Sequence, residues 1–177
     1  MRKVLVLVVM LAAPAAAEPL KVAREPQDAA AGGPSAITGI SGTGWFARAE
    51  IEAFFALPTS WKAGPAFGMN EGLEVWNDGD QWGFGWPIAV MGGLRVPGFR
   101  VLGGAGIDWI GAYHDPMAGT QIAARAFALA NASVDIEGVR VGVDARMGRH
   151  FVDNVPDFNR WELGISLGYT WPARHNL

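Results

Sequence analysis

Residues 161–171 read WELGISLGYTW, and every second residue of this stretch is large and apolar. The residues between them are polar or small, without exception. Side chains of a β-strand point to opposite faces in turn, so the stretch predicts a strand with one apolar face. It spans 11 residues, about the length of a tilted β-strand that crosses a bilayer. Aromatic residues lie at both ends of the apolar face, where membrane interfaces favour them.

The same period of two runs through six earlier segments, and helical spacing fits none of them as well. In the segment that ends at Tyr113, Trp109 and Tyr113 are expected on the apolar face and His114 on the opposite one. Glu71 is the one charged residue on the apolar face of its segment. The six segments are 45–57, 67–75, 82–90, 99–113, 122–136 and 139–147. With the last stretch they predict an all-β antiparallel fold of at least seven strands.

Tight turns are predicted at Asn77–Asp80, Pro97–Gly98 and Glu137–Gly138, because Asn, Asp and Gly favour the backbone of short hairpins. Longer connections are expected around 58–63, 114–119 and 149–157. The sequence therefore predicts short turns on one side of the sheet and longer loops on the other, which is typical of outer-membrane barrels.

The N-terminus predicts export. Residues 1–17 have a basic start, an apolar run and a small-residue cleavage site, which is the layout of a signal peptide. Its removal takes away two basic residues and shifts the formal net charge from −3 to −5, so nucleic acid is not an expected partner. The chain has no cysteine, which excludes disulfides and a lipid-modified N-terminal cysteine.

Four regions follow from these patterns: the signal peptide 1–17, a segment 18–41, a barrel domain 42–171 and a tail 172–177. The segment 18–41 mixes Ala, Gly and Pro without a period, so it is expected to be a flexible leader or to lie inside the fold. A short strand at Ala36–Ile40 is one alternative for this segment.

The face opposite the apolar one is largely glycine and alanine with isolated charges. A β-sandwich would place many more polar residues there, whereas a narrow barrel interior fits small side chains. Charges inside a barrel must pair, so we expect a network that fills and rigidifies the lumen. Its expected members are Arg48, Glu50, Glu52, Arg100, Asp108, Arg125, Arg140, Asp144, Arg146, Arg160 and Glu162.

From Thr43 to Trp171 the pattern resembles small eight-stranded, up-and-down outer-membrane β-barrels of Gram-negative bacteria. In that family the last strand ends in alternating hydrophobic residues and an aromatic, which the barrel-assembly machinery reads. Ile165, Leu167, Tyr169 and Trp171 resemble this assembly signal, although residues 172–177 follow it. The resemblance implies an eighth strand, either at Ala36–Ile40 or in a wrongly merged segment between Gln81 and Tyr113. It also implies outer-membrane lipid as a partner.

No residue pattern identifies a reaction, a cofactor or a surface partner. The histidines His114, His150 and His175 lack metal-ligand spacing. A lipid-modifying enzyme would need a histidine, a serine and a carboxylate together, and Ser133 and Ser166 are the strand serines on the polar side. We expect an outer-membrane barrel with a structural or surface-interaction role. The alternative is an exported β-sandwich or lipocalin-like barrel that binds an apolar ligand, in the periplasm or secreted.

Overall fold

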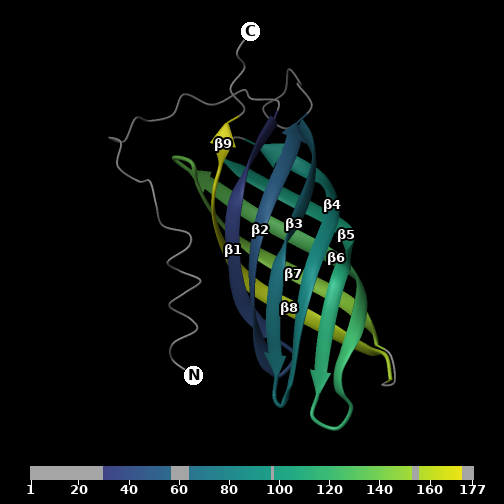
Figure 1. Cartoon of the computed structure of the whole chain (residues 1–177). Helices are drawn as coiled ribbons and strands as arrows, with labels where there is room; N and C mark the ends of the chain where they lie inside the picture. Colours follow the sequence, from purple (N-terminus) through teal and green to yellow (C-terminus); the bar gives the residue numbers. More distant parts are fainter. Residues whose placement is uncertain (1–29, 57–63, 97, 153–155, 173–177) are drawn as a thin grey trace.

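The computed structural model describes residues 30–56, 64–96, 98–152 and 156–172, which form an antiparallel β-barrel (Figure 1). Each strand pairs with the next along the chain, and β1 also pairs with β8, so the sheet closes. The short β9 follows β8 and pairs with the start of β1, which leaves a ring of eight strands. The strands are β1 (Ala30–Ser41), β2 (Gly44–Ala56), β3 (Gly64–Asp78), β4 (Gln81–Val96), β5 (Phe99–Asp115), β6 (Gly119–Ile136), β7 (Val139–Val152), β8 (Phe158–Tyr169) and β9 (Trp171–Pro172). The predicted eight-stranded, up-and-down fold is confirmed, and the closed ring excludes a sandwich.

The eighth strand is β1, which contains the alternative strand Ala36–Ile40 and extends it in both directions. The barrel therefore begins at residue 30 rather than at 42. Of the segment 18–41, residues 30–41 are described, and they form a strand of the barrel wall. The pairing explains this position, since β1 is bonded on one side to β2 and on the other to β8 and β9. Residues 1–29 and 173–177, with the expected signal peptide and most of the tail, lie outside the described residues.

Turns alternate between the two ends of the barrel (Figure 1). We call the end where β1 begins the upper end and the opposite end the lower end, as they lie in Figure 1. At the upper end Glu137 and Gly138 have φ of 53° and 85°, the left-handed pair that a two-residue hairpin turn requires. The expected separation of short turns from long loops is wrong. The short turn after β3 lies at the lower end, whereas the short turn after β6 lies at the upper end, because successive antiparallel strands reverse direction.

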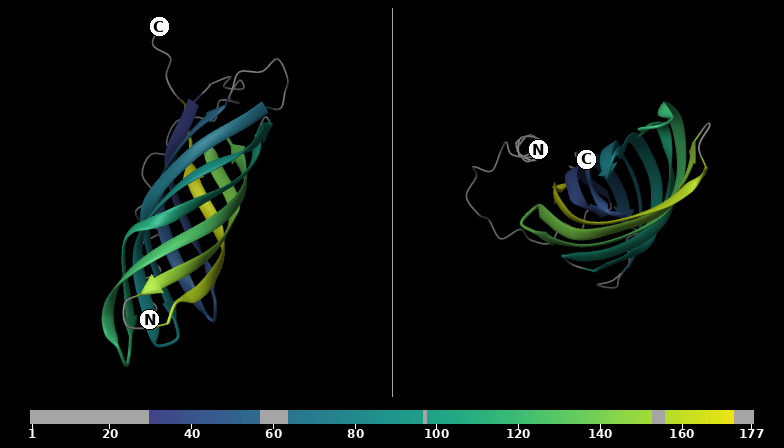
Figure 2. Two further views of the ribbon diagram at one scale, coloured as in Figure 1. Left: turned by 90° about the vertical axis from the view of Figure 1, so that its right-hand side faces the viewer. Right: turned by 90° about the horizontal axis from the view of Figure 1, so that it is seen from below.

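The wall has an apolar outer face and a buried inner face. On β8 the outward Leu163 and Ile165 are 46% and 66% exposed, whereas Glu162 on the inner face is 2% exposed. β7 alternates in the same way along its length. The strands are strongly inclined to the barrel axis (Figure 2), as closure of an eight-stranded sheet requires. Within the described ranges, no helix is long and apolar enough to cross a membrane.

A β-bulge in β5 reverses the expected faces near its end. The partners of Gly85 and Pro87 on β4 are Gly111 and Asp108, so β5 uses one residue more than its neighbour here. A one-residue shift moves every later side chain to the other face. Tyr113, expected on the apolar outer face, is therefore turned inward and is 3% exposed.

The lumen contains large apolar side chains as well as small residues and charges. One cluster lies at the lower end (Ile37, Phe46, Trp76, Tyr113, Ala123 and Val152, with Phe158 against it). A second lies on the wall from β2 to β6 (Phe54, Ala66, Ala89, Met91, Leu102, Phe127 and Leu129). Inner-face glycines make room for these rings. A Cβ atom at Gly83, Gly106 or Gly164 would overlap the ring of Trp76, Phe127 or Phe46, respectively.

Candidate functional site

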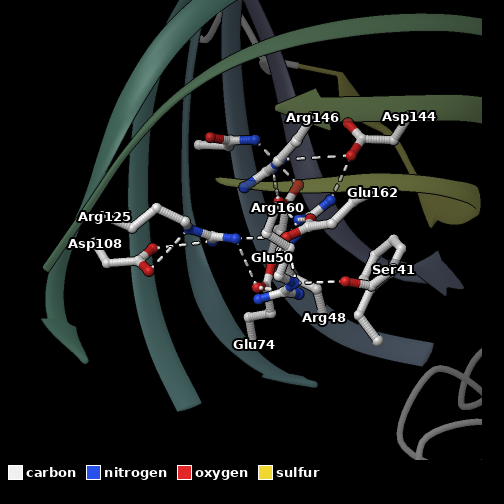
Figure 3. A network of polar contacts seen from close by, with 12 residues as sticks. Ser41, Arg48, Glu50, Glu74, Asp108, Arg125, Asp144, Arg146, Arg160 and Glu162 are labelled. Atoms are coloured by element: carbon white, nitrogen blue, oxygen red, sulfur yellow. Dashed lines mark hydrogen bonds and ion pairs between the residues drawn. The ribbon is translucent and has the colours of Figure 1, made fainter. Parts of the chain in front are cut away.

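Nine buried side chains in the middle of the lumen form one connected set of ion pairs, which we call the main network (Figure 3). They come from six strands, β2, β3, β5, β6, β7 and β8, so the network ties the wall together across its interior. Its members are Arg48, Arg125, Arg146 and Arg160 with Glu50, Glu74, Asp108, Asp144 and Glu162.

Arg48 is the centre of the main network. Its Nη1 donates to Glu74 Oε2 at 2.7 Å and to Glu162 Oε2 at 2.8 Å, and its Nε lies 2.7 Å from Glu50 Oε1. Its Nη2 donates to Asp144. The guanidinium is fully buried and also lies over the ring of Phe46 at 5.2 Å. One side chain of β2 thus joins carboxylates of β3, β7 and β8.

Arg125 extends the main network toward β5. It meets Asp108 through two nitrogens, Nε at 2.9 Å from Oδ2 and Nη2 at 3.0 Å from Oδ1. Its Nη1 lies 2.9 Å from Glu74 Oε1 and also contacts Glu162. Of these two contacts with Asp108, the one from Nη2 is a hydrogen bond, and together with the contacts to Glu74 and Glu162 it brings Arg125 within reach of three carboxylates.

Arg160 joins the main network to the aromatic cluster at the lower end. Its Nη2 lies 3.1 Å from Glu74 and 2.9 Å from Glu162, and its Nε donates to Ser41. The guanidinium lies 4.3 Å above the ring of Trp76. A cation above an aromatic face is favourable, so the charged and apolar parts of the lumen pack directly on each other.

A smaller set of ion pairs, which we call the second network, lies nearer the upper end. Arg100 meets Glu52 through two nitrogens, with Nη2 at 2.8 Å from Oε2. Arg140 Nη1 donates to the same Glu52 Oε2 at 3.0 Å, and its Nε lies 3.4 Å from Asp135 Oδ1. Arg100 Nε also donates to Ser133 Oγ at 2.9 Å. Glu52 therefore holds two arginines from different strands.

All of the charged residues expected in the lumen lie on the inner face, in one of the two networks. The sequence did not single out Glu74, although it contacts three arginines of the main network. The alternation of β3 places Glu74 on the same face as Asn70 and Trp76, which are both buried. This alternation alone could have identified Glu74 as a lumen residue.

In the part of the chain that the structure describes, His114 and His150 are not placed beside Ser133 or Ser166. His150 is buried and stacks on Phe158 with ring centroids 4.6 Å apart. His114 lies on the outer face, where its Nδ1 is 3.0 Å from Thr120 Oγ1. Ser133 is bonded to Arg100, and its strand partner is Gly142, whereas His150 is opposite Arg125. His175 lies outside the described residues.

The four residues of the expected assembly signal all point outward. Their exposed fractions range from 47% to 66%. The residues are Ile165, Leu167, Tyr169 and Trp171. Glu71 also points outward, in the middle of β3, between its cross-strand neighbours Ile51 and Ile88. Within the described part of the chain Glu71 has no ion pair or hydrogen bond.

Room for a ligand inside the barrel is small. An interior cavity between the two networks has a volume of about 10 Å³, far below the roughly 300–1,000 Å³ of ligand pockets. This volume does not admit the apolar ligand of a lipocalin-like barrel. In the described segments, no three His, Cys, Asp or Glu side chains are grouped so that they could hold a metal ion.

Comparison with known proteins gives a similar fold and no family. A scan against models of protein families finds no match, and neither does a search of curated proteins. Among solved structures, that of the outer membrane enzyme PagL is similar, with a TM-score of 0.49 and 15% sequence identity. The alignment covers 77% of this chain and 98% of that chain.

Proposed function

We propose that the protein is an outer-membrane β-barrel whose lumen is filled by side chains and which has a structural or surface-interaction role. The observation that carries the proposal is the inverted distribution of polarity across the wall. Ile165 on the outer face is 66% exposed, whereas Arg48 in the lumen is 1% exposed. A protein surrounded by water gains nothing from this arrangement, whereas a barrel surrounded by lipid needs it.

The filled lumen supports a structural role and not a wide channel. Eight strands leave an interior just wide enough for side chains, and here it contains the two networks and the apolar clusters. We therefore expect no steady ion conductance when the protein is inserted into a planar bilayer. Steady openings would contradict the filled lumen while leaving the outer-membrane location intact.

Lipid is the proposed partner of the outer face. A shallow groove of about 400 Å³ lies over β5, β6 and β7 and is lined by Ala105, Ala126, Ala128 and Met147. Arg149 is at the edge of the groove and pairs with Asp157 at 3.2 Å. Small outward residues let acyl chains approach the wall closely. Ile165, Leu167, Tyr169 and Trp171 would contact the barrel-assembly machinery before insertion.

Membrane fractionation and gel migration test the location. We expect the full-length protein to stay in the outer-membrane fraction after extraction with alkaline carbonate. In detergent it should migrate differently before and after boiling, because a closed barrel stays folded in unheated samples. A protein that is released as a soluble monomer without detergent would end the proposal. A changed composition of outer-membrane lipid on expression would instead assign it an enzyme activity.

A further inference from the structure

The cavity of about 10 Å³ lies where the main and second networks approach each other. Glu50 and Asp144 of the main network line one part of it, and Glu52 and Arg100 of the second network line another. This volume holds one water-sized body. The cavity thus offers a single position in contact with both networks.

Three oxygen atoms of the cavity lining have no hydrogen-bond partner within the described residues. They are Asn70 Oδ1, Asn131 Oδ1 and Ser166 Oγ. Asn70 and Ser166 are 5% and 4% exposed, so bulk water does not hydrogen-bond to them. The amide nitrogen of Asn70 donates to Glu50 Oε2 at 3.0 Å, which leaves its carbonyl oxygen as the free atom. Unpartnered buried polar atoms cost about 1–3 kcal/mol each, so an occupant that satisfies them stabilises the fold.

The charge of the main network indicates the sign of the occupant. Its ion pairs connect four arginines with five carboxylates, whereas the second network connects Arg100 and Arg140 with Glu52 and Asp135. The main network thus has one more carboxylate than guanidinium, and so does the cavity lining, in which Glu50, Glu52 and Asp144 lie with Arg100 and Arg140. With every carboxylate ionised, this leaves one negative charge in excess. A water molecule would satisfy the free oxygens but would leave this charge uncompensated, whereas a cation does both.

We propose that the cavity binds one monovalent alkali cation of the size of sodium. Hard cations take oxygen ligands, and carbonyl oxygens can replace the hydration shell of an alkali ion. Asn70 Oδ1, Asn131 Oδ1 and Ser166 Oγ would be the neutral ligands. The carboxylates of Glu50 and Asp144 are already paired with arginines, so they supply charge rather than a ligand set for a divalent ion. One excess charge matches one monovalent ion.

Thermal unfolding in different salts tests this site. Full-length protein in detergent micelles is dialysed into choline chloride, and unfolding is followed by tryptophan fluorescence while sodium chloride replaces choline chloride at constant ionic strength. Choline is too large for the cavity. We expect the unfolding midpoint to rise with sodium and to saturate. A midpoint that is the same in both salts would overturn the proposal. The cavity would then hold a water molecule, and a bound proton would neutralise the excess charge.

Two variants and a matched control locate the effect. Ser166→Ala removes one ligand, so we expect about ten times more sodium for half of the rise, and Asn70→Leu should abolish the rise. Ser133→Ala is the control, because Ser133 is equally buried but binds Arg100 and does not line the cavity. Ser133→Ala should lower the midpoint and keep the sodium dependence.

If Ser166→Ala and Asn70→Leu both keep the full sodium dependence, the ion acts at the surface and the proposal fails. A larger rise in magnesium chloride than in sodium chloride would also overturn it.

Discussion

On β8 Leu163 and Ile165 face outward, whereas Glu162, next to Leu163 in the chain, faces the lumen and binds three arginines. The two faces of one strand are thus stabilised in different ways. The outer face needs only to be apolar, and many residues satisfy that requirement. The lumen needs particular partners at particular distances, because a buried charge without its partner is costly. The effect of a substitution on stability therefore depends first on the face that it changes and only then on the chemistry of the new side chain.

The largest effect should come from breaking the main network at its centre. Arg48→Met leaves the carboxylates of Glu74, Asp144 and Glu162 without their shared partner. We expect a loss of about 3–5 kcal/mol in the free energy of unfolding, measured by urea titration in lipid vesicles. Arg149→Met is the control, since its ion pair with Asp157 is exposed and should contribute less than about 1 kcal/mol. Equal losses in both variants would contradict a special role of the lumen.

A charge placed on the outer face should have the next largest effect. Ile165→Arg puts a guanidinium on the lipid-facing side near the middle of β8, and such a change costs about 2–4 kcal/mol at the bilayer midplane. The same urea titration measures it. Met117→Arg, in the turn between β5 and β6, is the control and should change little, because Met117 is 98% exposed. A tolerated arginine at position 165 would show that this face does not contact lipid.

An added methyl group inside the lumen should cost less. Gly83→Ala places a Cβ atom within the ring of Trp76, so the ring must shift, at a cost of about 1–3 kcal/mol. Gly103→Ala is the matched control, because a Cβ atom there meets only a carbonyl oxygen at 3.7 Å. Unfolding midpoints of the two variants in detergent compare them. If Gly103→Ala is the more harmful change, the packing of the lumen described above is wrong.

The smallest effect, and the one stabilising change, is expected at Glu71. Replacing this outward carboxylate with leucine removes a polar group from the lipid-facing side, and we expect a gain of about 1 kcal/mol in vesicles. Leu73→Glu, two residues away on the same face, should have the opposite effect. A loss of stability in Glu71→Leu would indicate that Glu71 has a partner within the membrane.

The strands could be predicted from the sequence because large outward residues mark a period of two. β1 lacks this signal, since its outward residues include Pro34, Ala36 and Thr38. Its position depends on pairing with β2 and with β8, which are far apart in the sequence. Closure of the sheet, rather than local preference, makes this segment a strand.

The members of the networks could be predicted from alternation, but their partners could not. Arg48 and Asp144 are 96 residues apart, and they meet only because the barrel closes and fixes the register of each strand. The inward position of Tyr113 was missed for a related reason. One extra residue in β5 shifts the alternation, and the sequence pattern alone does not show where an extra residue is accommodated.

The fit between inner glycines and aromatic rings limits how this sequence can change over time. Trp76 and Gly83 are a pair in which the ring occupies the space that the glycine leaves open, whereas at Gly106 and Gly164 a Cβ atom would also meet the backbone oxygen of Ile88 or Thr38. Neither residue of the Trp76–Gly83 pair can change size without disturbing the other, so substitutions at the two positions are coupled. In related chains we expect positions 76 and 83 to vary together, with a smaller ring at position 76 accompanying a larger residue at position 83. Such covariation would reveal the inside of the barrel even where the outer face has lost all similarity.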